Sequence, residues 1–249
     1  MTTGHEALTV QGLDKRFGGL HFTLGVDVQL RAGERLALIG PNGAGKTTLV
    51  NLMSGVLKPS GGSILLAGVD VTQRSQAQRV RQGLSRTYQI TTLAMRLTVL
   101  QQVEMALHQR EGLASRLWRA ADGYGALRDE AWELLDSLGL AAVALRTPAA
   151  LAYGEQRLVE IALALALRPR VLLLDEPMAG VPQSEGATVL AALQRLPADL
   201  AVLLIEHDMD LVFRYAQRIV VLAEGAVLAS GTPDEIRRDE QVRSVYLGH

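Results

Sequence analysis

The most informative stretch of this sequence reads Gly40-Pro41-Asn42-Gly43-Ala44-Gly45-Lys46-Thr47-Thr48. It fits the pattern G-x-x-x-x-G-K-[ST], whose glycines let backbone N–H groups turn toward phosphate oxygens without a Cβ in the way. From average residue usage, the four fixed positions match by accident in roughly one chain in a hundred of this length. The flanking segments therefore discriminate between a phosphate-binding loop and an accidental glycine-rich turn.

These flanking segments favour the phosphate-binding loop. Residues 35–39 form a short apolar run that is typical of a buried strand, and residues 47–54 are compatible with a helix that stops at Gly55. A helix that starts in such a loop adds its partial positive charge to the backbone N–H donors. The motif then assigns Lys46 to the β- and γ-phosphates of a nucleoside triphosphate and the Thr47 hydroxyl to Mg²⁺.

Length and composition indicate one large globular domain. The chain has 249 residues, of which 48% are hydrophobic and 20% charged, and its formal net charge is −1. Without an overall basic field, nucleic acid is not a favoured partner. The absence of cysteine excludes disulfides and Cys-ligated zinc. We predict a single domain over residues 1–249 that carries a helical subdomain at residues 93–165.

No segment of the sequence has the character of a membrane span. Residues 1–10 lack the continuous apolar segment of a signal peptide, and no run reaches the ~20 apolar residues that cross a bilayer. The nearest run, residues 161–174, is interrupted by Arg168, Pro169 and Arg170, which favours two apolar elements that meet at a turn. We therefore expect a chain that is soluble on its own and reaches a membrane only through a partner.

The hydrophobic pattern changes twice along the chain. Residues 7–34 are β-rich, and Val26, Val28 and Leu30 alternate with polar residues as in a half-buried antiparallel strand. A turn at residues 59–62 leads into a further apolar run. Residues 93–140 instead show helical spacing, which is clearest in one amphipathic set. That set consists of Leu127, Ala131, Leu134, Leu135 and Leu138.

Strand and helix signals alternate again after residue 170. The runs 171–174, 202–205 and 219–222 are continuous and apolar, as in parallel strands that are buried on both faces. The sequence therefore predicts an α/β fold. Its core is that of a P-loop NTPase, with an N-terminal antiparallel β layer and an inserted helical subdomain.

Two carboxylates, Asp175 and Glu176, follow the first of these runs. In a triphosphatase, Asp175 would hold Mg²⁺ through water, and Glu176 would orient or deprotonate the attacking water. Two adjacent carboxylates repel each other, and a nearby cation would offset that repulsion. The alternative is that the pair caps a helix whose first residue is Pro177.

A third motif, Leu151-Ala152-Tyr153-Gly154-Glu155-Gln156-Arg157, lies between the two phosphate-site motifs. It resembles the signature motif of ABC ATPases in place and shape. Gln89 resembles the Q-loop glutamine of that family, His207 its switch histidine, and Phe17 the aromatic residue that stacks on adenine. The resemblance covers essentially the whole chain. For Phe17 the alternative is a core aromatic, and for His207 it is an ordinary surface residue.

The resemblance implies a head-to-tail pair of cassettes, in which each ATP lies between the phosphate loop of one chain and the signature motif of the other. It implies Mg²⁺ at Thr47, Gln89 and Asp175, and catalytic roles for Lys46, Glu176 and His207. It places the following residues at the nucleotide: Phe17, Gly40, Pro41, Asn42, Gly43, Ala44, Gly45, Lys46, Thr47, Thr48, Gln89, Ala152, Tyr153, Gly154 and Glu155.

Within the family, the chain is similar to the longer ATP-binding subunit of branched-chain amino-acid importers. The segments that carry this similarity are Arg16–Leu20, Leu151–Arg157, Ile205–Met209 and Val245–Gly248. The similarity implies a second ATPase subunit, two transmembrane permease subunits and, indirectly, a periplasmic substrate-binding protein. It also implies a peripheral location on the cytoplasmic face of the inner membrane.

Other functions share parts of this pattern. Importers of urea or amides and the lipopolysaccharide-export ATPase carry several of the same marks. A non-transport ABC ATPase is disfavoured by the single cassette. A P-loop kinase or GTPase would need neither the signature motif nor His207.

Three positions depart from the usual ABC pattern. Ala152 stands where the signature motif usually has serine, Tyr153 where it has glycine, and Pro182 where relatives carry Asp or Asn. The missing serine hydroxyl removes one hydrogen bond to phosphate, and proline lacks an N–H. We therefore expect an asymmetric heterodimer, in which this chain gives its weaker signature motif to the partner's ATP.

Overall fold

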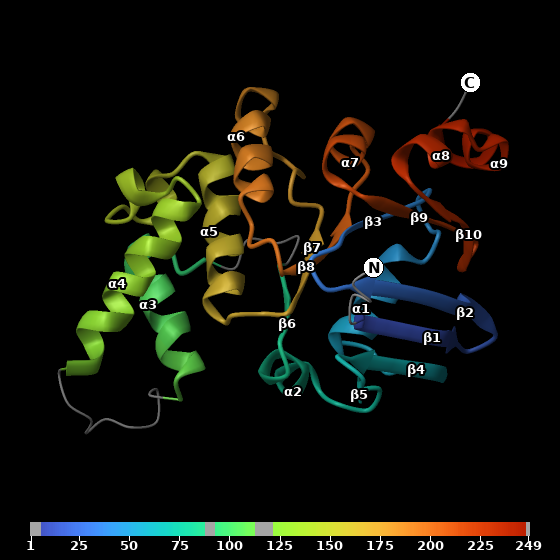
Figure 1. Ribbon diagram of the computed structural model, residues 1–249, viewed down its shortest axis with the longest axis horizontal. Coiled ribbons are helices and arrows are strands. Elements are labelled where there is room, and N and C mark those ends of the chain that lie inside the picture. The colour runs from blue at the N-terminus through green and yellow to red at the C-terminus, as the bar shows by residue number, and fades with distance from the viewer. Residues whose placement is uncertain (1–5, 88–92, 113–121, 248–249) are drawn as a thin grey trace. The chain divides into compact units, whose positions relative to one another are not determined.

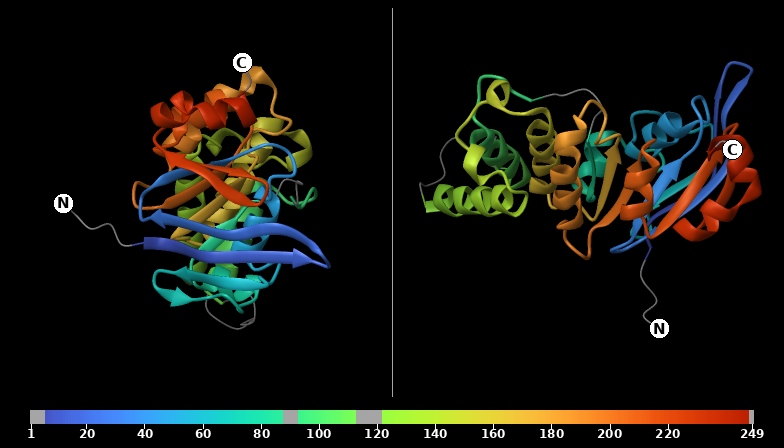
Figure 2. Two further views of the ribbon diagram at one scale, coloured as in Figure 1. Left: turned by 90° about the vertical axis from the view of Figure 1, so that its right-hand side faces the viewer. Right: turned by 90° about the horizontal axis from the view of Figure 1, so that it is seen from above.

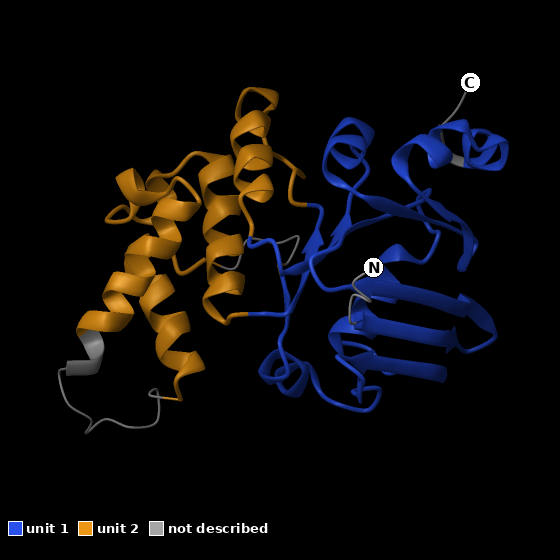
Figure 3. Cartoon of the chain, in the orientation of Figure 1, with its two compact units in different colours: residues 1–86, 169–176, 197–249 blue, residues 87–168, 177–196 orange. Residues whose placement is uncertain are grey.

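The computed structural model describes residues 6–87, 93–112 and 122–247 (Figure 1). These residues belong to two compact units (Figure 3). The first unit comprises residues 1–86, 169–176 and 197–249, and the second comprises residues 87–168 and 177–196. The proposed insertion at residues 93–165 lies within the second unit, which also takes in a later helix.

The strands of the described chain all lie in the first unit. They form a four-stranded antiparallel sheet in the order β2-β1-β4-β5 and a six-stranded sheet in the order β10-β9-β3-β8-β7-β6 (Figures 1 and 2). The strands are β1 (Glu6–Phe17), β2 (Leu20–Arg31), β3 (Arg35–Ile39), β4 (Gly61–Leu66), β5 (Val69–Asp70), β6 (Leu84–Arg86), β7 (Val171–Asp175), β8 (Ala201–Ile205), β9 (Arg218–Ala223) and β10 (Ala226–Gly231).

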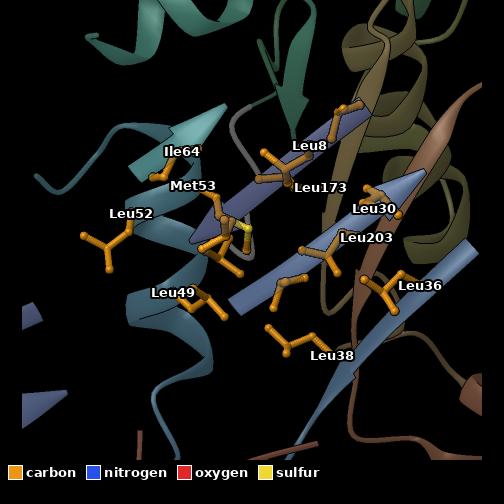
Figure 4. Close-up of a cluster of buried hydrophobic side chains, with 14 of the residues drawn as sticks. Leu8, Leu30, Leu36, Leu38, Leu49, Leu52, Met53, Ile64, Leu173 and Leu203 are labelled. Carbon is orange, nitrogen blue, oxygen red and sulfur yellow. The ribbon is translucent and has the colours of Figure 1, made fainter. Parts of the chain in front are cut away.

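The central strands of the six-stranded sheet are buried on both faces, as their continuous apolar runs predict. Leu36 and Leu38 of β3 belong to one hydrophobic cluster, whereas the alternating residues Ala37 and Ile39 belong to a second one. Figure 4 shows the first cluster, in which Leu36 and Leu38 lie with side chains of α1 and β4. Because successive side chains of a strand point to opposite faces, β3 needs an apolar layer on each side.

Strand β2 confirms the predicted alternation of the N-terminal layer. Val26, Val28 and Leu30 are buried, whereas Asp27 and Gln29 between them are exposed. The strand pairs with β1 in antiparallel register, with Val28 opposite Val10. One face of this sheet therefore contributes to the first hydrophobic cluster.

The helices divide between the units. Those of the first unit are α1 (Lys46–Ser54), α2 (Gln76–Arg81), α7 (Met209–Tyr215), α8 (Pro233–Arg238), α9 (Glu240–Val242) and the short η4 (Arg243–Leu247). Those of the second unit are α3 (Val99–Arg110), α4 (Asp122–Ser137), η2 (Ala141–Val143), η3 (Pro148–Ala150), α5 (Tyr153–Ala166) and α6 (Gln183–Gln194).

Two helix predictions are confirmed. Helix α1 ends at Gly55, which takes up the left-handed conformation and closes the last turn with a hydrogen bond to the carbonyl of Leu52. Helix α4 buries Leu127, Ala131 and Leu135, as its amphipathic spacing predicts.

The apolar run at residues 161–174 proves to be two elements. Helix α5 ends at Ala166 and strand β7 begins at Val171, with a short connection between them. In the part of the chain that the structure describes, no helix is both long enough and apolar enough to span a bilayer.

Candidate functional site

The loop at residues 40–45 connects β3 to α1, in the context that the motif requires. Gly40 and Gly45 have φ values of 149° and 99°. A Cβ at Gly40 would lie 2.1 Å from the carbonyl oxygen of Leu222, and one at Gly45 would lie 2.5 Å from that of Phe22. No other residue type fits at these two positions, because both the backbone conformation and the surrounding space require glycine.

The N-terminus of α1 has the properties of an anion site. Its N-cap residue is Gly45, and among the described residues no side chain caps it. The first N–H groups of a helix have no partner within the helix, and the helix dipole adds a partial positive charge there. Thr47 and Thr48 lie in this first turn, and the Thr47 side chain is exposed.

Lys46 lies over the loop that it follows in sequence. Its ammonium group donates hydrogen bonds to the carbonyl oxygens of Gly40 and Pro41, the latter at 3.0 Å. Burial lowers the pKa of Lys46 below its ordinary value, and the negative charge of Glu176 partly offsets that effect. The lysine is therefore half-buried, close to a carboxylate and held by backbone oxygens.

The sheet topology places His207 and the two carboxylates after β7 at the edge of the sheet where this loop begins. Strands β3, β8, β7 and β6 are parallel neighbours, with Leu38 opposite Ile205 and Ile205 opposite Asp175. Since parallel strands end at the same edge, His207 after β8 and the carboxylates at the end of β7 lie on the side of the phosphate loop.

Asp175 and Glu176 differ sharply in their surroundings. The side chain of Asp175 is 9% exposed, and its Oδ2 accepts a hydrogen bond from the guanidinium of Arg86 at 2.7 Å. Glu176 has a φ of 47°, and its N–H donates to the carbonyl of Ile205 at 2.9 Å. A non-glycine residue in this conformation is uncommon and costs free energy, and such residues gather at functional sites.

The alternative interpretation of the acid pair as a helix cap is wrong. Residues 177–180 form turns, and α6 begins only at Gln183, after Pro182. Neither Asp175 nor Glu176 therefore caps a helix.

His207 lies in the connection between β8 and α7. Its side chain is 67% exposed, which agrees both with a ligand contact and with an ordinary surface residue. The buried carboxylate of Glu206 accepts hydrogen bonds from the backbone N–H groups of His207 and Asp208 at 2.9 and 3.3 Å. Asp208 in turn caps α7 through its side chain. The backbone at His207 is therefore fixed while its imidazole faces outward.

Phe17 is not a core residue. It is 44% exposed at the end of β1, and its ring meets that of Phe22 edge to face, with centroids 5.1 Å apart. The ammonium of Lys15 lies 4.7 Å from the Phe17 centroid. An exposed, supported ring of this kind suits stacking on a planar ligand.

The signature-like residues lie in the second unit, at the N-terminus of α5. Ala152 is the N-cap and has no hydroxyl to offer, but the carboxylate of Glu155 accepts a hydrogen bond from its N–H at 2.9 Å. The N–H of Gly154 donates to Glu185 Oε2 of α6 at 2.6 Å. The guanidinium of Arg157 lies over the ring of the atypical Tyr153, with its Cζ 5.4 Å from the ring centroid.

Pro182 suits its position in the backbone. It is the N-cap of α6 with a φ of −57°, within the range that the proline ring imposes. Its carbonyl accepts hydrogen bonds from the N–H groups of Glu185 and Gly186. The side-chain cap that Asp or Asn would supply is absent from this helix.

The sequence alone did not identify two side chains that lie at the site. Arg86 binds Asp175 from 89 positions away in the sequence, and Glu206 orders the backbone before α7. The only sequence signal for Arg86 is a charge at the end of a three-residue strand, which is too short to show a period. Gln89, a predicted nucleotide and Mg²⁺ ligand, lies outside the described residues.

The fold and this geometry define a P-loop nucleotide-binding protein. A family model described as ABC transporter matches residues 24–179, and a second one, described as branched-chain amino acid ATP-binding cassette transporter, matches residues 226–249. The chain belongs to the ABC transporter family and is an ATPase of that family.

The most similar relatives include two transport proteins. The high-affinity branched-chain amino acid transport ATP-binding protein LivG of Escherichia coli is 41% identical, over 97% of both chains. The corresponding protein BraF of Pseudomonas aeruginosa is 38% identical, also over 97% of both chains. Among solved structures, a nucleotide-free cassette from an ABC transporter matches with a TM-score of 0.84 and 28% identity, over 98% of this chain and 100% of the other.

Proposed function

We propose that this chain is the ATP-hydrolysing subunit that powers the import of branched-chain or related hydrophobic amino acids through a membrane permease. The match at residues 226–249 carries the proposal, because it lies beyond the part that the general ABC model covers. The names of the two curated relatives point to the same solutes.

The first unit offers groups for the phosphates and for the adenine of ATP. Gly40 and Gly45 let the loop pack against backbone carbonyl groups with which a Cβ would clash, and the uncapped start of α1 supplies N–H donors for phosphate oxygens. Lys46 exchanges its two carbonyl partners for the β- and γ-phosphates. Phe17 offers its exposed ring to adenine.

The same unit fits a magnesium ion that is held mainly by phosphates. Among the described residues, no three carboxylate or imidazole groups cluster closely enough to hold a metal ion by themselves. Mg²⁺ in such sites takes one or two protein ligands and completes its shell with phosphates and water, where it neutralises charge on the phosphoryl group. Thr47 would bind the ion directly and Asp175 through water. Gln89, which the family resemblance also assigns to Mg²⁺, lies outside the described residues.

Glu176 and His207 serve the hydrolysis step. Glu176 accepts a proton from the attacking water, from the position directly after the ladder that Asp175 ends, and its unusual φ is of the kind that gathers at functional sites. His207 contacts the γ-phosphate from a backbone that Glu206 and Asp208 hold in place.

The signature-like motif serves a partner subunit. In the proposed heterodimer, the start of α5 (Ala152, Tyr153, Gly154 and Glu155) faces the ATP that is bound by a second, shorter cassette. Ala152 offers no hydroxyl there, and Pro182 caps α6 without a side-chain bond. These two features support unequal ATP sites.

Purification of the tagged chain from detergent-solubilised membranes of its source organism tests this proposal. Mass spectrometry should find two permeases with several spans each and a second cassette. Such a complex would hold this chain on the cytoplasmic face of the inner membrane. Recovery of soluble proteins alone would contradict the transport role and favour a non-transport ABC ATPase. The permeases recovered also separate an amino-acid importer from a urea, amide or lipopolysaccharide system.

A separate experiment tests the heterodimer. The isolated Glu176→Gln chain should remain monomeric with ATP at micromolar protein concentrations. A tight ATP-dependent homodimer, together with wild-type hydrolysis at two equivalent sites, would contradict it.

A further inference from the structure

One arginine side chain joins the phosphate-loop helix to the carboxylate at the end of β7. The guanidinium of Arg86 donates to Asp175 Oδ2 at 2.7 Å, to Asn51 Oδ1 at 2.7 Å and to Ser54 Oγ at 3.1 Å. The side chains of Arg86 and Asp175 are only 7% and 9% exposed. All four residues belong to the first unit.

The two terminal nitrogens of the Arg86 guanidinium bind different groups. Nη2 binds the carboxylate, while Nη1 binds the two neutral acceptors on α1. A planar guanidinium holds its donors in a fixed fork, which a lysine ammonium cannot reproduce. Arg86 therefore fixes the Asp175 carboxylate relative to α1.

The face of α1 that binds Arg86 also carries Thr47. Asn51 lies four residues after Thr47, and Ser54 lies three residues further, so the three side chains share one face of the helix. Thr47 and Asp175 are the two described residues that the proposed function assigns to magnesium. The arginine thus connects one of these ligands to the helix that carries the other.

We propose that Arg86 is a positioning residue for the magnesium site. It holds the Asp175 carboxylate at the distance from α1 at which Asp175 and Thr47 serve one hydrated ion together. The proposal rests on the proposed function, since it takes both ligand assignments from there. Residues that orient metal ligands in this way commonly change metal affinity by about 10–100-fold when they are altered.

Arg86→Gln and Arg86→Lys test the proposal through nucleotide binding. The readouts are the Mg²⁺ concentration for half-maximal binding of a fluorescent ATP analogue and the analogue's affinity in EDTA. We expect the Mg²⁺ midpoint to rise about tenfold in both variants while the affinity in EDTA stays within about twofold of wild type. Mn²⁺ bound with the nucleotide gives a second readout, because its electron paramagnetic resonance spectrum reports ligand geometry.

Two further variants keep the outcome interpretable. Asn51→Ala removes one acceptor on α1 and leaves the ion pair between Arg86 and Asp175 intact. We therefore expect the Mg²⁺ midpoint to rise only about threefold, which is less than the roughly 10–100-fold change expected when a residue that orients a metal ligand is altered. Arg79→Lys is the matched control. Arg79 is also a buried arginine bound to α1, through the carbonyls of Leu52 and Met53, but it does not touch Asp175. Its variant should shift the unfolding temperature and leave the Mg²⁺ midpoint unchanged.

The results that would overturn the inference about Arg86 differ from the result that would overturn the proposed function. If both Arg86 variants keep the wild-type Mg²⁺ midpoint and only their unfolding temperatures fall, Arg86 is a structural ion pair and the inference is wrong. If Arg86→Lys alone behaves as wild type, charge and not positioning accounts for the effect, and the inference is wrong again. A wild-type chain that binds no nucleotide under any condition would overturn the proposed function as well.

Discussion

The N–H of Gly154 on α5 donates to the carboxylate of Glu185 on α6, with 2.6 Å between nitrogen and Oε2. A carboxylate at the start of a helix satisfies an N–H that lacks a partner within the helix, and it interacts favourably with the helix dipole. In the proposed dimer, the same N–H faces a phosphate of the partner's ATP. The two acceptors therefore compete for one donor.

Glu185→Gln weakens the internal acceptor. We expect the free energy of unfolding to fall by about 1 kcal/mol, because a charge-assisted hydrogen bond becomes a neutral one. In the complex with its partner subunit, half-maximal ATP-dependent association should require less ATP than in wild type. Urea denaturation and light scattering measure the two effects. Glu133→Gln, at an exposed position on α4, should change neither.

Gly154→Ala tests the close approach of α5 and α6. The added Cβ would lie 2.9 Å from Glu185 Oε2 and 3.3 Å from Val189 Cγ2, so we expect a loss of about 1–2 kcal/mol. The matched control is Gly125→Ala in α4, where nothing lies within 4 Å of the added Cβ. Since alanine is the better helix former, this control should be stabilised by up to about 1 kcal/mol. If chemical denaturation gives the same change in the free energy of unfolding for Gly154→Ala and Gly125→Ala, the close packing at Gly154 is contradicted.

Much of the core was predictable from the sequence because its signals are local. The apolar runs located β3, β7, β8 and β9 to within one residue, because the inner residues of a strand that is buried on both faces are continuously apolar. Gly55 located the end of α1, because a left-handed C-terminal residue is usually glycine.

The contacts at the edge of the sheet were not predictable in the same way. Arg86 meets Asp175 only because β6 and β7 are neighbours in the six-stranded sheet, and a pairing across 89 residues leaves no periodic trace. The role of Glu206 depends likewise on a turn of the backbone after β8. The helix-cap interpretation of Asp175 and Glu176 was wrong because Pro177 starts a turn and not a helix.

Lys46→Met separates stability from nucleotide binding. Burial lowers the pKa of Lys46, so the folded state binds this proton less tightly than the unfolded state, and the charged lysine opposes folding at neutral pH. Without nucleotide, we expect Lys46→Met to melt no lower than wild type. ATP should raise the melting temperature of wild type but not of the variant. Lys58→Met, at an exposed position, should retain the response to ATP.

Tyr215 makes stability sensitive to alkaline pH. Burial raises the pKa of its hydroxyl to about 12, and among the described residues this hydroxyl has no hydrogen-bond partner. Because the unfolded tyrosine ionises near its ordinary pKa of 10.0, the folded state loses stability as the pH rises from about 10 to 12.

Tyr215→Phe should remove this alkaline loss. It should also stabilise the chain by about 1 kcal/mol at pH 7, because it removes a buried hydroxyl without a partner. Denaturation series at pH 7, 10 and 11 measure both effects. A lower stability of Tyr215→Phe at pH 7 would show that the hydroxyl does have a partner. Tyr153→Phe provides a control at a residue that is 40% exposed.

The uptake of radiolabelled leucine, isoleucine and valine by cells that lack this gene tests the central claim most directly. We expect uptake to fall on deletion and to return with the wild-type chain. Glu176→Gln should not restore it, because loss of a general base slows hydrolysis by roughly 10²–10⁴-fold. Urea uptake should remain unchanged throughout. Normal uptake of the three amino acids in the deletion strain, or full rescue by Glu176→Gln, would contradict the account.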